Sequence, residues 1–432
     1  FVGNYEDLGG NCFAFSCQDS DKNGIPNECD DTQVDILNVP DDYPTIASAI
    51  TAAGYGDIIE IAAGLYFPGA PINPGGKPIT VRGQVDSDGF PLTILDGQGL
   101  HHVLECYASE GSETLFENLL ITGGQASRGG GMEISSSSPT INNCVFQANT
   151  ATSTYARGGG IYCSNGSPVL NDCVFQANTV TGTTSAYGGG VYCFNGSPVL
   201  NNCIFQANTV AGTTNAWGGG MYSSGGTPSL TNCQFLLNSA TGSEAFGGGV
   251  YCSYSEPILL DTCLLTENVA ASGGGIYCGE TSEVILLGTV ICSNTQGQIF
   301  GSYTSDEFSC LTSVCTDSDD DGILDCFDQC PGIPDIDTDG DGVPDCIDLC
   351  PKDPNATVPG ICGCNVEDDD TDSDGDGVYD CVDQCPGQPD VDTDGDGIAD
   401  CIDPCIEWPG ECSEDGSTLY VPVGEAIQTA IN

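Results

Sequence analysis

The sequence predicts an all-β protein in two parts: a solenoid of stacked short coils, followed by a loop-rich segment that lacks a conventional apolar core. Two repeats lead to this prediction. Gly-Gly-Gly followed by an apolar residue begins at 129, 158, 188, 218, 247 and 273, which gives steps of 26 to 30 residues. From residue 310 onward this pattern gives way to regularly spaced aspartates and to 13 of the 27 cysteines.

Composition limits the classes of function. The 432 residues include 62 Asp or Glu and only 6 Lys or Arg, a formal net charge of −56. Binding to nucleic acid or to anionic lipid needs a basic surface, so both are excluded. The chain contains no run of 18 apolar residues that would predict a membrane span. So many cysteines indicate disulfides, and therefore an extracellular or cell-surface protein.

The first 34 residues repeat a later part of the chain. Nine residues between Gly3 and Ile25 match residues 298 positions further on, and Cys12 and Cys17 match Cys310 and Cys315 in this way. We therefore expect residues 1–18 to be the end of a preceding solenoid unit. Residues 19–34 are expected to be a short linker of the same kind as the later acidic segment.

The central part of the chain repeats in units that cannot fold alone. Each step contains a glycine triplet and a block in which an apolar residue precedes Asn by three positions. The pairs are Phe146 and Asn149, Phe175 and Asn178, Phe205 and Asn208, Phe235 and Asn238, and Leu265 and Asn268. A unit of about 30 residues with two or three short strands cannot bury its own apolar face, so coils must stack, like residue over like residue.

These blocks resemble the repeats of chlamydial polymorphic outer-membrane proteins, and residues 35–309 resemble the right-handed parallel β-helices of the pectin-lyase-like superfamily. Residues 41–50 are similar to the short amphipathic helix that caps such β-helices. Residues 56–61, 79–83, 93–97 and 119–123 look like its first coils. The resemblance implies a right-handed parallel β-helix over residues 35–314. It leaves function open, because this fold carries lyases, hydrolases, adhesins and inert spikes.

Two columns of cysteine are expected inside the coils. One comprises Cys144, Cys173, Cys203, Cys233 and Cys263, and the other comprises Cys163, Cys193, Cys252 and Cys278, interrupted by Ser223. Buried cysteine is an ordinary small apolar residue, and free thiols are the favoured interpretation. Disulfides between the columns, for example from Cys163 to Cys173, are the alternative.

One surface strip is a candidate contact site. The residue before each glycine triplet is Arg128, Arg157, Tyr187, Trp217, Phe246 or Ser272, one for each coil. A second row comprises Tyr162, Tyr192, Tyr222, Tyr251 and Tyr277. Because coils lie about 4.8 Å apart, each row should stack. The stacking could only stabilise the coils, or the first row, from Arg128 to Phe246, could contact a protein or sugar rings.

The acidic segment repeats a cation-binding pattern. Asp317-x-Asp319-x-Asp321-Gly322 continues to Asp325 and Asp328, and the same spacing begins at Asp337, Asp372 and Asp392. Carboxylates at positions 1, 3, 5, 9 and 12, glycine at position 6 and a backbone carbonyl at position 7 are what a calcium loop requires. A shorter version begins at Asp19. The predicted calcium ligands are Asp19, Asp21, Asn23, Ile25, Asp30, Asp317, Asp319, Asp321, Ile323, Asp325, Asp328, Asp337, Asp339, Asp341, Val343, Asp345, Asp348, Asp372, Asp374, Asp376, Val378, Asp380, Asp383, Asp392, Asp394, Asp396, Ile398, Asp400 and Asp403.

Residues 315–416 thereby resemble thrombospondin type 3 repeats, which implies several calcium ions and a loop-rich stalk stabilised by calcium and disulfides. Position 12 is Asp where an EF-hand has Glu. Because residues 310–432 carry 33 acidic residues and one base, we expect more ions than motifs, with Asp335, Asp370 and Asp390 as extra ligands. A disordered acidic linker and zinc held by the cysteines are the weaker alternatives.

We predict that the solenoid is not an enzyme. Sites that cleave polyuronides combine acids with Arg, Lys or His. The body offers few such residues, and His101 and His102 are interpreted as a surface turn. A strongly negative chain also repels a polyanionic substrate.

The last residues, 417–432, look like the start of another β-helix, because Val421 and Pro422 and the residues after them resemble Val39, Pro40 and the cap sequence. We therefore expect an extracellular structural protein whose partner is itself: a tandem or head-to-tail β-helix filament stiffened by calcium. The alternative is a calcium-dependent adhesin that binds glycan or another surface protein through the aromatic strip. A polysaccharide lyase is the third and least favoured hypothesis.

Overall fold

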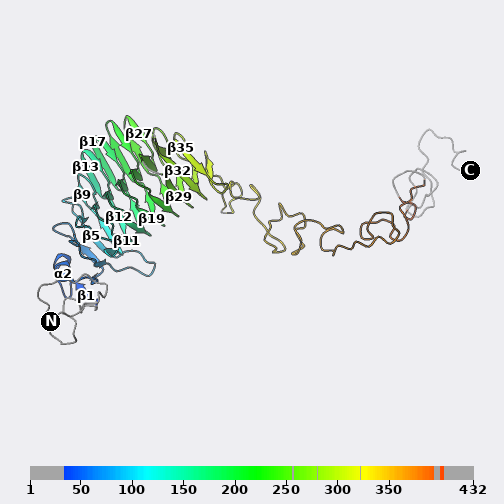
Figure 1. Ribbon diagram of the computed structural model, residues 1–432, viewed down its shortest axis with the longest axis horizontal. Coiled ribbons are helices and arrows are strands. Elements are labelled where there is room, and N and C mark those ends of the chain that lie inside the picture. The colour runs from blue at the N-terminus through cyan, green and yellow to red at the C-terminus, as the bar shows by residue number, and fades with distance from the viewer. Residues whose placement is uncertain (1–33, 255–256, 280, 322, 394–398, 403–432) are drawn as a thin grey trace, which may run out of the picture. The chain divides into compact units, whose positions relative to one another are not determined.

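A computed structural model describes residues 34–254, 257–279, 281–321, 323–393 and 399–402. The chain divides into two compact units, with the boundary between Cys315 and Thr316. The first unit is a solenoid of parallel strands with one short helix (Figure 1). The predicted all-β class and β-helix architecture are confirmed.

Three long parallel sheets run the length of the first unit, and in a full coil the chain visits each of them once. Sheet 1 comprises, in spatial order, β1 (Ile36–Val39), β2 (Ile58–Ile61), β4 (Thr80–Arg82), β7 (Leu115–Glu117), β11 (Thr140–Asn142), β15 (Val169–Asn171), β19 (Val199–Asn201), β24 (Ser229–Thr231), β29 (Ile258–Asp261), β32 (Glu283–Leu287) and β35 (Ser302–Ser305).

Sheet 2 comprises β3 (Gly64–Tyr66), β5 (Thr93–Asp96), β8 (Leu119–Thr122), β12 (Val145–Gln147), β16 (Val174–Gln176), β20 (Ile204–Gln206), β25 (Gln234–Leu236), β30 (Leu264–Thr266), β33 (Val290–Cys292) and β36 (Cys310–Thr312). Sheet 3 comprises β6 (Leu104–Cys106), β10 (Met132–Ser135), β14 (Ile161–Ser164), β18 (Val191–Phe194), β23 (Met221–Ser224), β28 (Val250–Ser253), β31 (Ile276–Cys278) and β34 (Ile299–Phe300).

A fourth sheet lies between sheets 2 and 3 along the chain in the middle coils. Its strands are β9 (Gln125–Ala126), β13 (Thr150–Arg157), β17 (Thr179–Tyr187), β21 (Thr209–Gly212), β22 (Asn215–Trp217), β26 (Ser239–Thr241) and β27 (Glu244–Phe246). A small separate core of Ala and Val side chains, such as Ala156 and Val180, packs here. This sheet was not predicted, because its Thr- and Ser-rich strands resemble turns in sequence.

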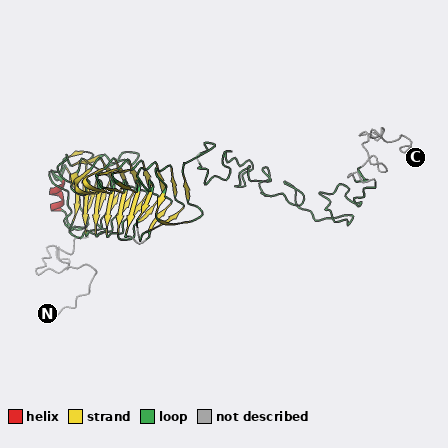
Figure 2. Ribbon diagram, turned by 90° about the horizontal axis from the view of Figure 1, so that it is seen from above, coloured by secondary structure: helices red, strands yellow, loops and turns green. Residues whose placement is uncertain are grey.

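One end of the coil stack is covered by helix α2 (Ile46–Ala52), the red element in Figure 2. Thr45 caps the helix: its side chain accepts a hydrogen bond from the Ser48 backbone N–H, and the Ser48 hydroxyl oxygen accepts one from the Thr45 N–H. Ile46, Ala49 and Ile50 face the core. The expected cap helix therefore exists, but it begins at residue 46, because Thr45 takes an extended conformation as the N-cap.

Identical side chains stack between coils, as the repeat predicts. Phe146, Phe175, Phe205 and Phe235 are fully buried, with neighbouring ring centroids 4.5 to 5.1 Å apart. The first glycine of each triplet has φ between +58° and +70°. A Cβ at Gly158 would lie 2.3 Å from the Ile161 carbonyl oxygen, so the turn into sheet 3 requires glycine.

The two cysteine columns also form. All ten body cysteines from Cys106 to Cys278 are buried free thiols, including Cys163 and Cys173, so the suggested disulfide between the columns is absent. Cys292 instead forms a disulfide with Cys315 at the end of the unit. No helix in the described part of the chain is long and apolar enough to cross a membrane.

Candidate metal sites and the aromatic strip

The second unit has loops where the first has strands. Between 316 and 402 the described residues form turns and bends without a helix or strand. Disulfides link them, among them Cys330–Cys346, Cys350–Cys364, Cys362–Cys381 and Cys385–Cys401. Disulfides of this density are typical of secreted chains that lack a large core, and they indicate an extracellular protein.

The predicted carboxylates come together in three loops. In each, one oxygen of positions 1, 3 and 5 lies within 4.8 Å of the other two. The groups are Asp317, Asp319 and Asp321; Asp337, Asp339 and Asp341; and Asp372, Asp374 and Asp376. Glycine makes the loop possible: Gly342 and Gly377, at position 6, have φ of +94° and +97°.

Positions 3 and 12 share an unusual arrangement in all three loops. At position 3, one oxygen of Asp319, Asp339 or Asp374 accepts a hydrogen bond from the backbone N–H two residues later. At position 12, one oxygen of Asp328, Asp348 or Asp383 does the same. The second oxygen of each of these six carboxylates is buried and has no hydrogen-bond partner.

Such oxygens are costly unless something positive reaches them, because a buried acceptor without a partner loses its hydration. Asp328 and Asp348 are more than nine-tenths buried. Loss of hydration and the nearby charges, Asp321 first among them, raise the pKa of Asp319 above its ordinary value. The pKa values of Asp339 and Asp374 are raised in the same way. A hard divalent cation among these carboxylates would satisfy them, so the donor set fits calcium.

The remaining motif positions have other partners. At position 1, the two oxygens of Asp337 accept hydrogen bonds from the N–H groups of Gly340 and Gly342, at 2.7 and 3.0 Å. At position 9, the carboxylate of Asp345 accepts hydrogen bonds from both the N–H and the hydroxyl of Thr338. Asp325, Asp380 and Asp400 hold the corresponding Ser or Thr in the same way. Position 9 thus fixes the loop from its outer side.

Two of the three expected extra ligands lie beside a motif. The Asp335 N–H donates to Asp321 at 3.3 Å, and the Asp390 N–H donates to Asp376 at 3.1 Å. Burial, then the charges of Asp328 and Asp321, raise the pKa of Asp335. Both residues therefore join the loop that precedes them. Asp370, the third, is exposed.

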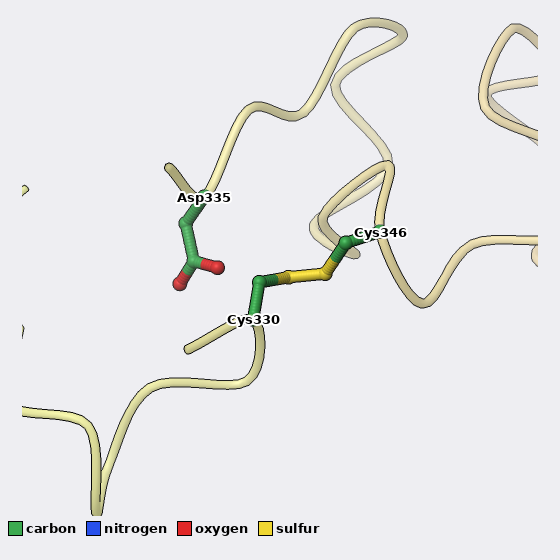
Figure 3. A group of neighbouring side chains, drawn as sticks. All are labelled: Cys330, Asp335 and Cys346. Carbon is green, nitrogen blue, oxygen red and sulfur yellow. A yellow bond between two sulfur atoms is a disulfide. The ribbon is translucent and has the colours of Figure 1, made fainter. Parts of the chain in front are cut away.

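Figure 3 shows Asp335 beside Cys330 and Cys346, a group that could suggest a thiolate metal site. The two sulfur atoms are bonded to each other as a disulfide. They are therefore not thiolates, and a zinc site of the Cys type is excluded at this position.

Some predicted ligands lie outside the described residues. These are Asp19, Asp21, Asn23, Ile25 and Asp30 of the short linker, and Asp394, Asp396, Ile398 and Asp403 of the fourth loop. Asp392 and Asp400 of that loop are described. At position 7, the N–H groups of Val343 and Val378 donate to the aspartate at position 5, and so does that of Ile323.

The aromatic strip forms on the first unit, as two interlocking rows. Tyr162, Tyr192, Tyr222 and Tyr251 are buried on the outer face of sheet 3, and they stack face to face with centroids 4.8 to 5.3 Å apart. Tyr187, Trp217 and Phe246 pack over them. Trp217 stacks on Tyr251 at 4.9 Å. The guanidinium groups of Arg128 and Arg157 extend the cover over Tyr162 and Tyr192. Ring faces are thus largely occupied by other rings.

A polar cluster that the sequence analysis missed lies where this strip begins. His102 contacts Glu105 at 2.9 Å and Glu133 at 3.9 Å through its two ring nitrogens. Arg128 pairs with Glu133 at 2.6 Å. Glu133 is the residue of β10 that corresponds to Tyr162 in the next coil, and Glu105 corresponds to both in β6. The presence of two glutamates at this position, where later coils have tyrosine, was the feature of the sequence that could have predicted the cluster.

Comparison with protein-family models agrees with the β-helix fold. Residues 100–210 match the family "Right handed beta helix region". Among solved structures, the chain is similar to pectin methylesterase in complex with a hexasaccharide, and to a mutant of pectin methylesterase in complex with another hexasaccharide. Each is 12% identical with a TM-score of 0.34, and the match covers 62% of this chain and 80% of the other. No curated protein sequence matches this chain.

These matches correct one prediction. We expected the chain not to be an enzyme, but both solved structures are enzymes, so that exclusion is wrong. The prediction rested on the few acidic and basic residues of the middle coils. It did not foresee that stacking of the early coils brings Glu105, Glu133, His102 and Arg128 together. The likeness concerns the fold alone and assigns no activity to this chain.

Proposed function

We propose that this protein is an extracellular structural module, in which a rigid β-helix is joined to a calcium-binding stalk. The observation that carries the proposal is the repeated pair of buried carboxylate oxygens without hydrogen-bond partners, at Asp319 and Asp328, Asp339 and Asp348, and Asp374 and Asp383. Their spacing and their oxygen-only chemistry favour calcium over softer metals.

Charge balance supports the same role. Residues 316–432 hold 33 acidic residues and one base, a net charge of −32. No large apolar core offsets this repulsion, since most apolar side chains of the described part, such as Ile333 and Ile336, are exposed. Calcium ions between the carboxylates would replace the missing core, with disulfides holding the loops in place.

Small-angle scattering of the full chain tests this role. With calcium in excess, the dimensions should be smaller than in excess chelator, because removal of the ions restores repulsion between aspartates. Sodium chloride at the same ionic strength is the control for general screening. Equal dimensions with calcium and with chelator would contradict the proposal.

We further propose that the module is one repeat of a tandem or head-to-tail filament. The support is in the sequence: residues 1–18 match the end of the β-helix unit, and residues 417–432 resemble its start. Electron microscopy of native material tests this, since periodic fibres are expected. Dispersed single particles at all concentrations would contradict the assembly but leave calcium binding untouched.

A second candidate function is adhesion through the aromatic strip. Tyr187, Trp217 and Phe246 are only partly buried and lie in a continuous row beside Arg157. Their edges are available to a protein or a glycan. Glycan-array binding that is lost in Trp217→Ala would favour this function.

A further inference from the structure

We infer that Cys252 and Cys278 form a disulfide site that covalently closes one coil of the β-helix in the secreted protein. The inference is independent of the calcium and filament proposals. It rests on the in-register pairing of the two cysteines, on the distance between their sulfur atoms, and on the residues that isolate them from other thiols.

Register places the two side chains one above the other. Cys252 in β28 pairs directly with Cys278 in β31, in adjacent parallel strands. Such strands lie about 4.8 Å apart, within the Cα separation of about 4.4–6.8 Å that disulfides span. The two sulfur atoms are 3.0 Å apart, so a small rotation of the side chains brings them to bonding distance. Both residues are buried.

The neighbours of the pair leave each thiol with one partner. On one side, Ser223 pairs with Cys252 and interrupts the column. On the other, Gly301 follows the β34 residues that pair with Ile276 and Tyr277, so it stands where the next side chain would be. A Cβ at Gly301 would lie 2.7 Å from the Cβ of Cys278. The pair is therefore isolated within its column.

The other cysteine column differs in chemistry. Each thiol there donates to the backbone carbonyl two residues before it, as Cys263 does to Asp261 at 3.4 Å. Cys263 also reaches the Leu230 carbonyl and accepts a hydrogen bond from the Cys233 N–H. Backbone carbonyls are thus available to each thiol of this column, although neighbouring sulfur atoms also interact, as Cys233 does with Cys203 and Cys263. Cys252 instead donates to the sulfur of Cys278.

The bond forms by exchange with a low-molecular-weight or enzyme disulfide of the oxidising compartment. The Cys278 thiolate attacks one sulfur of that disulfide, which gives a mixed disulfide and releases one thiolate. Cys252 then loses its proton and attacks the Cys278 sulfur, which forms the Cys252–Cys278 bond and releases the second thiolate. Two cysteine thiols are oxidised and one external disulfide is reduced. Because the pair is buried, the exchange occurs before the last coils stack.

In the stacked coil, the hydrogen bond from Cys252 lowers the pKa of Cys278, and the same bond together with burial raises the pKa of Cys252. Before the coils stack these shifts are absent, and the same disulfide forms if Cys252 attacks first. The product would join residues 26 positions apart, in the unit that also contains the Cys292–Cys315 disulfide.

Peptide mapping of the full chain, secreted without reductant, tests the inference. The protein is denatured at acidic pH with N-ethylmaleimide, and digested with a protease that cleaves after acidic residues. Glu256, Asp261 and Glu267 separate Cys252, Cys263 and Cys278 onto different peptides. Cys263 is the internal control, because it should be alkylated directly.

The expected result is a peptide pair joined through Cys252 and Cys278, about 2 mass units lighter than the sum of its parts, which separates on reduction. Cys278→Ser should convert Cys252 into a directly alkylated thiol. Direct alkylation of both residues in the unreduced wild type, or their recovery in bonds to other cysteines, would overturn the inference.

Discussion

At the level of single residues, buried asparagine side chains connect neighbouring coils through hydrogen bonds. The Asn208 amide donates to the Phe175 carbonyl at 2.8 Å and to the Asn238 side chain at 2.9 Å, while its oxygen accepts from Asn178. The side chain is fully buried, so every bond it makes is shielded from water. One side chain thus satisfies polar groups in the coils on both sides of its own.

Replacement of Asn208 by Ala should therefore destabilise the first unit. The Phe175 carbonyl would lose the donor on Asn208, and the Asn178 backbone N–H would be left buried without its acceptor, which lowers the free energy of unfolding by about 2–4 kcal/mol. Denaturant unfolding measures this. Gln206→Ala, which removes a partly exposed amide from the same coil, is the matched control and should change stability by less than about 0.5 kcal/mol. Equal effects of both substitutions would contradict the account.

Buried thiols give a second prediction at this scale. Burial is the main cause that raises the pKa of Cys144 to about 12. Hydrogen bonding with Cys203 and burial raise that of Cys233 to about 12. Both thiols should therefore resist aromatic disulfide reagents at pH 8 in the folded protein and react in denaturant. Above a pH of about 9 the unfolded chain loses protons that the folded thiols keep, so the free energy of unfolding should fall as pH rises. Rapid reaction of the native protein would refute this.

At the scale of elements, the repeat made most of the β-helix predictable. Glycine triplets, Phe-x-x-Asn blocks and cysteine columns each mark one position per coil. All three patterns follow from the same in-register pairing of strands in adjacent coils. The fourth sheet was missed because Thr150–Arg157 and Thr179–Tyr187 carry few large apolar residues and pack through Ala and Val. The His102 cluster was missed because its members come from separate parts of the sequence and meet only where β6 and β10 pair.

The predicted calcium loops were likewise only partly predictable from the sequence. The spacing of the aspartates alone predicted that the carboxylates at positions 1, 3 and 5 converge, and the structure places their oxygens close to one another. Spacing could not distinguish position 9, because the second residue of the loop, Ser or Thr, binds that carboxylate through both its N–H and its hydroxyl. It also could not assign Asp335 to the preceding loop, which depends on how the chain returns after Cys330.

A variant pair tests the first calcium loop. Asp319→Asn with Asp328→Asn removes the charge of the two carboxylates that have a buried oxygen without a partner, so calcium affinity of that loop should fall at least about tenfold. Asp320→Asn is the matched control, because Asp320 is exposed and its φ of +61° suits Asn equally. Titration calorimetry should show one class of sites lost only in the double variant. Unchanged stoichiometry and affinity would contradict the assignment.

A substitution in the aromatic strip distinguishes a structural role of the strip from a role in contact with a partner. If Trp217 serves only the stacking with Tyr187, Tyr251 and Phe246, Trp217→Ala should lower the free energy of unfolding by about 1–2 kcal/mol and leave association unchanged. If it is a contact residue, association or glycan binding should weaken while the melting temperature stays nearly constant. Tyr155→Ala, an exposed aromatic residue outside the strip, is the control.

At the scale of the whole molecule, two different principles stabilise the two units. The first buries a continuous apolar column from Leu37 to Ile291. The second has disulfides and converging carboxylates in place of such a core. The account therefore predicts that the units respond separately to solution conditions: a chelator acts on the second unit, and substitution of Asn208 acts on the first.

Hydrogen exchange of the full chain, with calcium and with excess chelator, tests whether calcium stabilises the second unit. The aspartate oxygens hold the amides of Asp321, Val343, Cys350 and Asp376, so exchange at these sites reports on each loop. The account predicts that chelation removes protection between 316 and 402 and leaves residues 34–315 unchanged. The same slow or fast exchange between 316 and 402 in both conditions would contradict it.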